Sequence, residues 1–501
     1  MLTQNKIISI DTAISTVDSD IVLCYGHFNL IHPGHLRYLQ YAKTLAEKLF
    51  VALVSDADLH KDSFGQHFSE NERAESVANL QIIDGVIILN QITLKDLIDK
   101  VKPSALVLGK EFEKIRSNEI NEAIEVVKKT GRVVYHAGEA HYFNANLLYS
   151  NVVDIEGSSK VQFQEICKKY KITANKLQEK IHQFSKSKLL VIGDTIVDNY
   201  VACDALGMSA EAPVLVVKEL ESREFIGGAA IVASHVKALG AECYYISVVG
   251  DDPQSEMVSE SLKEQNIKID LFTDKDRPTT YKTRYMVEGQ KLFRVSRIKD
   301  YKIPTKIEQE IIDSLIKLAP SIDGIMISDF VYGVITQKIL DEISNLSTQY
   351  GIKLYGDLQC SSQVGKVNKF KGFDLITPTE KEARVALDDN ESGIEWIANT
   401  LLKDTNSKNI LTKLGSDGFI AYKGGTSIES QNFPALTINP VDATGAGDSL
   451  FAAMSISLSS GSSLMEASAI GACMASLAVK QVGNNPISKE KLSIFIEEIL
   501  S

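Results

Sequence analysis

The chain has 501 residues, 44% of them hydrophobic and 24% charged, so it is long enough for about three domains and too apolar to be disordered. Its 65 acidic residues outnumber 53 basic ones, which gives a formal net charge of −12. This balance excludes duplex nucleic acid and anionic membranes as expected partners, because both require a basic surface.

Strand-like and helix-like segments alternate through the first third of the chain. Short apolar, β-branched runs predict strands, and apolar residues at three- and four-residue spacing predict the helices between them. The expected strands cover 21–25, 50–55, 85–89, 105–109 and 133–136, and the expected helices cover 36–49, 70–81, 94–101 and 119–129. This alternation predicts an open α/β domain over residues 18–155.

A polar, lysine-rich stretch, residues 156–186, follows this domain, and we interpret it as a helical linker. A second and larger α/β pattern occupies residues 187–501. Its expected strands cover 189–192, 244–249, 324–328, 353–357, 375–377 and 409–413. Alternating runs at 280–287 and 291–298 flank a short turn and predict a hairpin that stands off this sheet.

The first motif is GHFNLIHPGH, residues 26–35, between the first expected strand and helix. Ligands of an open parallel sheet bind beyond the carboxyl ends of its strands. His32 and His35 straddle the helix start, where free N–H groups and the positive end of the helix dipole favour an anion. Imidazoles placed there could stabilise a transferring nucleotidyl group and the departing pyrophosphate.

This motif closely resembles the signature loop of the nucleotidyltransferase superfamily that includes cytidylyltransferases, and the resemblance continues to about residue 152. It implies a Rossmann-like fold with His32 and His35 as catalytic residues. It also implies nucleotide or phosphate contacts from Gly26, Phe28, Gly34, Lys61, Arg73 and Gly109. The chain departs from the family's pattern at Asn29, where Asp is frequent, and at 108–112, so the choice of nucleotide stays open.

The second motif is DATGAGD, residues 442–448, which precedes an apolar helix. Its glycines let backbone N–H groups converge on phosphoryl oxygens at a helix start. Asp448 could accept the proton of an attacking hydroxyl. The motif therefore predicts an anion hole and a general base side by side.

This motif resembles the C-terminal signature of the ribokinase-like (PfkB) sugar kinases, and the resemblance covers the whole second domain. It implies that Asp448 is the base and that Glu382 acts indirectly on Mg²⁺. The implied nucleotide contacts are Thr412, Gly415, Gly418, Gly445, Ala446 and Gly447. The implied substrate contacts are Asp194, Asp198, Gly227, Gly228, Lys282, Arg284, Arg294 and Asp329. The 280–298 hairpin fits the family's lid, which often dimerises.

Segments 211–214, 282–284 and 328–330 are similar to the heptose-phosphate kinase half of the bifunctional enzymes that make the nucleotide-activated heptose of lipopolysaccharide. In those enzymes the kinase precedes the transferase, whereas here the order is reversed. Ile231, Tyr332, Gln359 and Thr379 depart from their pattern, and two of these changes remove lysines. Lys282, Arg284 or Arg294 would then have to anchor a sugar phosphate.

The resemblances together predict a bifunctional enzyme that makes a nucleotide-activated sugar. One domain would phosphorylate a sugar or sugar phosphate with Mg²⁺ and ATP, as with a heptose 7-phosphate at its anomeric hydroxyl. The other would couple a sugar 1-phosphate to a second nucleoside triphosphate, ATP or CTP. The alternatives are another sugar with a CTP-dependent polyol-phosphate or sugar-phosphate cytidylyltransferase, or one domain acting as a non-catalytic ligand-binding or dimerising module.

The six cysteines are scattered without a CxxC pair, and no apolar run is long enough for a membrane span. We therefore expect a cytoplasmic enzyme whose partners are sugars, sugar phosphates and nucleotides. A homodimer through the kinase lid is a further expectation.

Overall fold

The computed structural model describes residues 6–14, 20–31, 33–58, 68–90, 92–109, 112, 117–136, 155–211, 214–287, 290–360, 363–425, 429–437 and 440–501. Internal contacts divide the chain into two compact units, one of residues 1–153 with 389–399 and one of 154–388 with 400–501. Both units are α/β, as predicted from the sequence. Among the described residues, no helix combines the length and apolar character that crossing a membrane requires.

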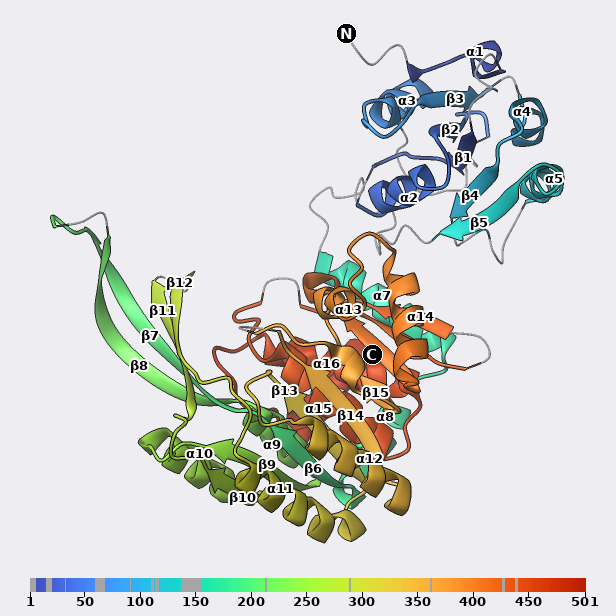
Figure 1. The fold of residues 1–501 in the computed structure, drawn as a ribbon. Coiled ribbons are helices and arrows are strands. Elements are labelled where there is room, and N and C mark those ends of the chain that lie inside the picture. Colours follow the sequence, from blue (N-terminus) through green and yellow to red (C-terminus); the bar gives the residue numbers. More distant parts are fainter. Residues whose placement is uncertain are drawn as a thin grey trace. The chain divides into compact units, whose positions relative to one another are not determined.

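The first unit has a five-stranded sheet in the order β3-β2-β1-β4-β5, with every neighbouring pair parallel. Its strands are β1 (Ile21–Gly26), β2 (Lys48–Val54), β3 (Gly85–Leu89), β4 (Ala105–Gly109) and β5 (Arg132–His136). Its helices are α1 (Ile10–Ile14), α2 (Pro33–Lys43), α3 (Glu70–Ala78), α4 (Leu94–Val101) and α5 (Asn118–Val127). The strand order reverses between β1 and β4, so a ligand site is expected beyond their carboxyl ends (Figure 1).

Both faces of this sheet are buried because successive side chains of a strand point to opposite faces. Ile21 and Leu23 of β1 join the core cluster that includes residues of α4 and α5. Val22 and Cys24 join the cluster that includes residues of α2 and α3. The near-continuous apolar runs of the sequence thus follow from a sheet covered on both sides.

The second unit has a nine-stranded sheet in the order β10-β9-β6-β13-β14-β15-β16-β17-β18. Its strands are β6 (Lys188–Gly193), β9 (Glu242–Val249), β10 (Lys268–Thr273), β13 (Gly324–Asp329), β14 (Lys353–Leu358), β15 (Leu375–Ile376), β16 (Asn409–Lys413), β17 (Phe419–Lys423) and β18 (Glu429–Phe433). Pairing is parallel from β10 to β16 and antiparallel from β16 to β18.

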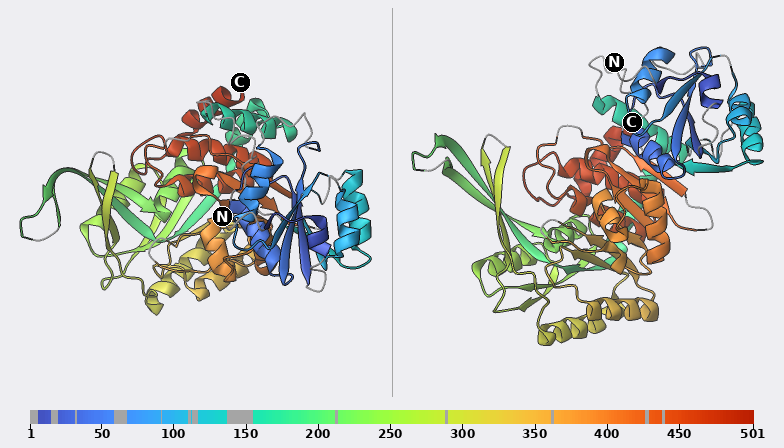
Figure 2. Two further views of the ribbon diagram at one scale, coloured as in Figure 1. Left: turned by 90° about the horizontal axis from the view of Figure 1, so that it is seen from above. Right: turned by 45° about the horizontal axis from the view of Figure 1, so that its top comes forward.

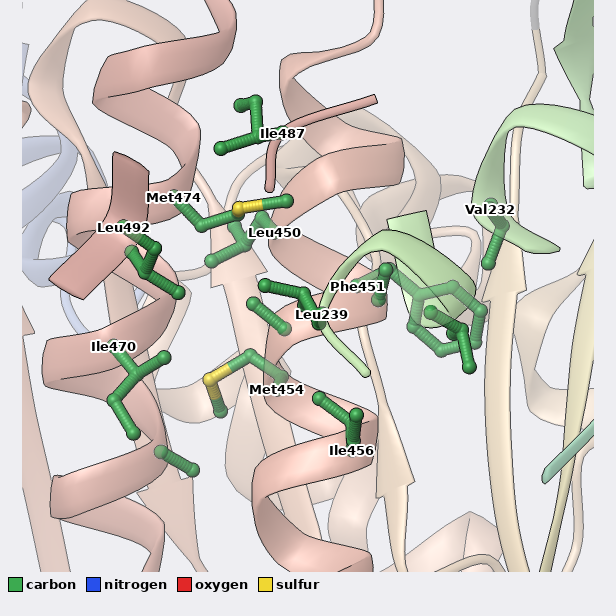
Figure 3. Packing of buried hydrophobic residues seen from close by; sticks show 14 of the residues in the cluster. Val232, Leu239, Leu450, Phe451, Met454, Ile456, Ile470, Met474, Ile487 and Leu492 are labelled. Atoms are coloured by element: carbon green, nitrogen blue, oxygen red, sulfur yellow. The ribbon is translucent and has the colours of Figure 1, made fainter. Parts of the chain in front are cut away.

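Helices pack around this large sheet and fill its core (Figure 2). The helices that contribute to this core cluster are α7 (Ile155–Lys169), α8 (Ala174–Gln183), α9 (Ala229–Ala238), α10 (Pro253–Glu264), α15 (Ala446–Ser459), α16 (Leu464–Ala478) and α17 (Lys489–Leu500). The unit also contains α11 (Thr305–Leu318), α12 (Gln337–Tyr350) and α13 (Glu380–Leu387), whereas α14 (Ile394–Thr405) crosses the boundary between the two units at residues 399 and 400. Figure 3 shows Phe451 and Met454 of α15 packed among residues of α16 and α9, so the helix that carries the second motif is anchored in the core.

A separate four-stranded sheet, the lid sheet, has the order β12-β11-β7-β8. Its strands are β7 (Thr195–Met208), β8 (Leu215–Gly228), β11 (Thr280–Val287) and β12 (Gln290–Arg297), and it projects away from the main sheet (Figure 1). The predicted hairpin is therefore present as β11 and β12. The long β7–β8 hairpin was not predicted, because its exposed half carries few alternating apolar residues.

The segment predicted to be a linker is helical, but it is not a solvated connection. Phe163, Cys167, Leu177 and Ile181 of α7 and α8 are buried in the core cluster of the second unit. These residues lie at helical spacing between the lysines, so one face of each helix is apolar. The second unit therefore begins before residue 187.

Candidate functional site

The first candidate site lies where the loop after β1 leads into α2. Phe28 in this loop has a positive φ of 48°, and its buried ring lies 5.0 Å from the His35 ring, centroid to centroid. A Cβ on Gly26 would lie 3.0 Å from the Phe28 ring, so glycine lets the loop fold over the end of β1. His35 is thereby placed in the first turn of α2, at the positive end of the helix dipole.

The structure brings several other predicted residues to the same edge of the sheet. Gly34 lies in the first turn of α2, and Gly109 ends β4, which pairs with β1. Tyr38 of α2 donates a 2.5 Å hydrogen bond to the Val107 carbonyl and so ties the helix to β4. His32 and Lys61 lie outside the described residues.

Arg73 differs from its predicted role as a phosphate contact. Its guanidinium is fully buried and donates to the carbonyls of Phe68, His27 and Val54. It also pairs with Asp56 at 2.7 Å. The geometry therefore favours a role for Arg73 in holding the β1 loop, the end of β2 and the start of α3 together.

The second unit contains a cavity of about 560 Å³ that runs from the lid sheet to the first turn of α15. One end is lined by the charged residues Asp198, Lys282, Arg284 and Arg294. The other end is lined mainly by apolar residues, among them Phe419, Pro434, Leu436, Ala472, Ala475 and Val479. Asp448 and the glycine turn before it line the same cavity. An apolar slot, a glycine-rich helix start and a cationic end thus form one continuous site.

Asp448 lies in the first turn of α15 and is 6% exposed. Burial and the neighbouring Asp357 carboxylate raise its pKa to about 7, although Lys413 and a hydrogen bond from Gln359 oppose the shift. Gln359 Nε2 donates to Asp448 Oδ1 at 2.6 Å. A carboxylate with this pKa can take up a proton near neutral pH, as a general base must.

The turn before Asp448 requires glycine. Gly445 has a φ of 79°, and a Cβ there would lie 2.2 Å from Asn484 Oδ1. Thr444 N and Lys291 Nζ both donate to Asp442 Oδ1, at 3.0 Å and 3.1 Å. Lys291 belongs to β12, so the lid sheet contacts the base of this turn directly.

Lys413, at the end of β16, was not singled out from the sequence. It lines the cavity, and its Nζ lies 2.6 Å from Asp357 Oδ1. Burial alone would lower its pKa, but Asp357 and Glu382 outweigh that effect and raise it, so the amine is protonated. The residue is an isolated lysine in an apolar strand, and no sequence pattern distinguished it from a surface lysine.

Asp198 and the lid cations form the charged end of the cavity. Arg284 of β11 forms an ion pair with Asp198, and Asn484 Nδ2 donates to the other carboxylate oxygen at 3.1 Å. The Lys282 amine lies 5.1 Å and 5.3 Å from the ring centroids of Phe330 and Tyr332. Arg294 lines the cavity from β12. The structure thus places the three predicted lid cations along one cavity, and Arg284 among them pairs with Asp198.

The two predicted glycines beside this end permit close packing. A Cβ on Gly227 would lie 2.5 Å from Asp198 Oδ2, and one on Gly228 would lie 2.4 Å from the Asp194 carbonyl. Gly228 also has a φ of 59°, which glycine adopts without strain. Any larger residue would therefore displace Asp198 or the start of α9.

Asp194 and Asp329 were predicted to contact substrate, but neither is among the residues that line the cavity. Asp194 Oδ2 accepts from the N–H of Phe330 at 2.8 Å and of Tyr332 at 3.4 Å. Asp329 pairs with Lys369 and accepts from the N–H of Val331, which has a strained φ of 64°. These carboxylates hold the turn that carries Phe330.

Glu382 lines the cavity and closes a capping box at the start of α13 with Thr379. Its carboxylate accepts from the N–H of Cys360 at 2.9 Å and of Thr379 at 2.8 Å. Both oxygens are thus held in place, which suits a contact to a metal through water. Among the described residues, no group of three or more metal-ligating side chains is found.

The remaining predicted nucleotide contacts lie around the β16–β17 turn. Gly415 and Gly418 line the cavity and have φ values of 65° and 86°. A Cβ on Gly418 would lie 2.1 Å from the Phe433 carbonyl, so this position requires glycine. Thr412 is buried in β16 and is not among the lining residues. Ala446 lines the cavity beside Gly445 and Gly447.

Comparisons with known proteins agree with both family resemblances. The family described as pfkB family carbohydrate kinase matches residues 186–491, and the family described as cytidylyltransferase-like matches residues 23–279. A Bifunctional protein HldE from Campylobacter jejuni is 31% identical over 313 residues, which are 62% of this chain and 65% of the relative. Another from Helicobacter hepaticus is 33% identical over 307 residues, 60% of this chain and 62% of the relative. The aligned regions thus span less than two thirds of these relatives.

Solved structures show the same fold for the second unit. Escherichia coli phosphofructokinase-2 with substrates and products has a TM-score of 0.52 at 16% identity, and covers 62% of this chain and 99% of its own. Arabidopsis thaliana ribokinase with ribose and ATP has a TM-score of 0.50 at 20% identity, with the same coverage of both chains. At these identities the likeness establishes the fold alone.

Proposed function

Because the chain belongs to the pfkB family of carbohydrate kinases and has a cytidylyltransferase-like region, we propose that it is a bifunctional transferase of nucleotide-sugar synthesis. The second unit would phosphorylate a sugar or sugar phosphate with ATP. The first would join a sugar 1-phosphate to a nucleoside triphosphate and release pyrophosphate. The observation that carries the kinase proposal is the single cavity that joins Asp448, the glycine turn and the lid cations.

The cavity supports a kinase step at the start of α15. A sugar held by Asp198 would place one hydroxyl beside the Asp448 carboxylate, which takes the proton as the oxygen attacks the γ-phosphorus. The first turn of α15 offers N–H groups to the transferring phosphoryl oxygens. The apolar slot suits a nucleobase, because it offers flat hydrophobic surface next to the phosphate site.

The charged end of the cavity supports a substrate that is already anionic. Lys282, Arg284 and Arg294 reach it from the lid sheet, whereas Asp198 is the one carboxylate among the lining residues of that end. Cations supplied by the lid can bind the oxygens of a phosphate group that the substrate already carries. We therefore favour a sugar phosphate of the heptose 7-phosphate type, phosphorylated at its anomeric hydroxyl, over an unphosphorylated sugar.

The first unit supports nucleotidyl transfer through the α2 start. His35 and the N-terminal turn of α2 lie at the strand-order reversal, where an anion would be bound. A donating imidazole there would stabilise charge on the α-phosphate and on leaving pyrophosphate. An ADP-heptose type of product is the main proposal, and a CTP-dependent reaction is the competing one.

Mg²⁺ fits the carboxylate character of the kinase site. Glu382 faces the cavity with both oxygens fixed by backbone N–H groups, so it would hold a metal-bound water in position. When bound with ATP, Mg²⁺ would neutralise charge on the phosphates. Asp448 is the proton acceptor for the reacting hydroxyl, and the hydrogen bond from Gln359 holds it in place without the metal.

The lid sheet supports a homodimer. Exposed apolar residues gather on β7, β8 and β12, among them Leu206, Met208, Leu215, Val216, Leu220, Leu292, Phe293 and Val295. An apolar patch of this kind marks an interaction surface.

A cytoplasmic location is consistent with the six cysteines, all of which are unpaired.

The test is a substrate panel read by mass spectrometry. The protein is incubated with mixed nucleoside triphosphates, Mg²⁺ and heptose, hexose and polyol phosphates. We expect a heptose bisphosphate from a heptose 7-phosphate and a nucleotide-heptose from a heptose 1-phosphate, whereas products only from other sugars would reject the heptose proposal. Asp448→Asn should abolish sugar phosphorylation and leave nucleotidyl transfer, and His35→Ala should do the opposite. Loss of both activities in either folded variant would reject the two-site proposal.

A further inference from the structure

The buried amine of Lys413 lies at the phosphate end of the kinase cavity. Its side chain is 11% exposed, and its Nζ would lie 3.5 Å from a Cβ placed on Gly447. The amine is therefore against the first turn of α15, where backbone N–H groups lack intrahelical partners. A protonated amine beside such a turn adds a full charge to the partial charge of the helix dipole.

One hydrogen-bonded link holds Lys413 at a fixed separation from Asp448. Asp357 accepts from Lys413 at 2.6 Å and from Gln359 Nε2 at 3.1 Å, and Gln359 Nε2 also donates to Asp448 at 2.6 Å. Thr377 Oγ1 donates to the same Asp357 oxygen as Lys413, at 2.6 Å. The base and the amine are thus positioned by the same two side chains at the end of β14.

The distribution of charge sets Lys413 apart from the other cations of the cavity. Lys282, Arg284 and Arg294 line the cavity from the lid sheet, and Arg284 pairs with Asp198. Lys413 comes from the main sheet and lies beside Gly447 of the glycine turn, whereas Lys291 of β12 contacts the base of that turn but is not among the residues that line the cavity. The lid cations are therefore placed to bind the sugar substrate. Lys413 is placed to bind the phosphoryl group that is transferred.

We propose that Lys413 is a catalytic residue of sugar phosphorylation, whose ammonium group binds the transferring phosphoryl group while the Asp357–Gln359 link sets its distance from Asp448. This inference rests on the proposed kinase activity. In the step, the sugar oxygen bonds to the γ-phosphorus of ATP and its proton passes to Asp448. The bond from phosphorus to the β,γ-bridging oxygen breaks and ADP leaves. Lys413 keeps its proton and stabilises the charge on the phosphoryl oxygens.

Lys413→Met tests the charge at nearly constant length. We expect kcat for sugar phosphorylation to fall by about 10² to 10³, with KM for ATP changed by less than about fivefold. The acidic limb of the pH–rate profile should also move to higher pH, because Lys413 lowers the pKa of Asp448. Lys369→Met is the matched control, since Lys369 pairs with the buried Asp329 but does not line the cavity.

A second variant separates catalysis from charge balance in the core. Lys413→Met leaves Asp357 buried without its cation and could unfold the protein, whereas Lys413→Met with Asp357→Asn removes both charges. We expect this double variant to unfold near the wild-type temperature and to stay about 10²-fold slow. Asp357→Asn alone should stay within about tenfold of wild type, because its amide oxygen can still accept a hydrogen bond from Lys413 and so keeps the link.

The outcomes distinguish the inference from the function on which it rests. A double variant with near wild-type kcat would show that Lys413 only neutralises Asp357 and would overturn the inference. Asp357→Asn alone as slow as the double variant would overturn it as well, because Lys413 would then contribute nothing of its own. A wild-type protein that phosphorylates none of the sugars would overturn the proposed kinase activity together with the inference.

Discussion

Two buried clusters in the second unit have the same composition but different surroundings. Asp194 lies near Asp329, which pairs with Lys369, and Asp448 lies near Asp357, which pairs with Lys413. In each cluster, burial and then the neighbouring carboxylate raise the pKa of the first aspartate to about 7.

Only the second of these clusters reaches the cavity. Asp448 and Lys413 line it, whereas Asp194 turns one oxygen toward the backbone N–H groups of Phe330 and Tyr332. A raised carboxylate pKa therefore does not by itself identify a catalytic base. Access to substrate and the kind of donor that faces the carboxylate distinguish the two roles.

The largest expected effect separates the two aspartates directly. Asp448→Asn should lower kcat for sugar phosphorylation by about 10³, because an amide cannot accept the proton of the attacking hydroxyl. Steady-state kinetics with the sugar identified in the panel measures this change. If turnover fell less than about tenfold, Asp448 would not be the base.

A smaller effect is expected when the donor to the base is removed. Gln359→Met takes away the hydrogen bond that favours ionised Asp448, so the pKa of Asp448 should rise further from about 7. The rate increases with pH as Asp448 ionises, so the acidic limb of the profile should shift upward by about one pH unit. At pH 7 this corresponds to a loss of about fivefold. If the acidic limb did not move, the pH dependence of the rate would not arise from the ionisation of Asp448.

Replacing the other aspartate should change turnover little. Asp194→Asn keeps an oxygen that accepts from the Phe330 and Tyr332 N–H groups, and Asp194 is not among the lining residues. We expect kcat and the sugar KM to stay within about threefold of wild type, with a small shift in melting temperature. A loss as large as that of Asp448→Asn would place Asp194 in the substrate site after all.

The smallest expected effect concerns stability, which Asp448→Asn should raise although it lowers turnover. A folded-state pKa of about 7 lies above the ordinary aspartate value, so ionising Asp448 costs stability as pH rises from about 4 to 7. Asp448→Asn should therefore be more stable than wild type at pH 8, by about 1 to 2 kcal/mol, and nearly equal at pH 4. Thermal unfolding at both pH values measures this difference. A variant less stable at pH 8 would indicate that ionised Asp448 stabilises the fold.

Most of the alternating strands and helices could be predicted from the sequence. The contacts that buried charged side chains make in the fold could not. The β1–α2 loop, the 442–448 turn and the β11–β12 hairpin were found because glycines and apolar periodicity mark them locally. Arg73 and Lys413 were misjudged or missed for one reason. A lone basic residue in a sequence does not reveal that distant carbonyls or carboxylates surround it. The 156–186 segment was wrongly predicted to be a linker, because its lysines and other polar residues outnumber the apolar residues that are buried in the core.

The packing of α7 and α8 determines where the chain can be divided. Both helices are held by the opposite end of the sequence, since Lys160 and Gln164 donate to the carbonyls of Glu498 and Ile499. Gln178 donates likewise to the carbonyl of Ser493 in α17. A fragment cut at residue 187 would lose these helices and expose the apolar face of α17, which favours aggregation. A fragment that starts before residue 155 retains α7 and α8 and so keeps their hydrogen bonds to the 493–499 segment.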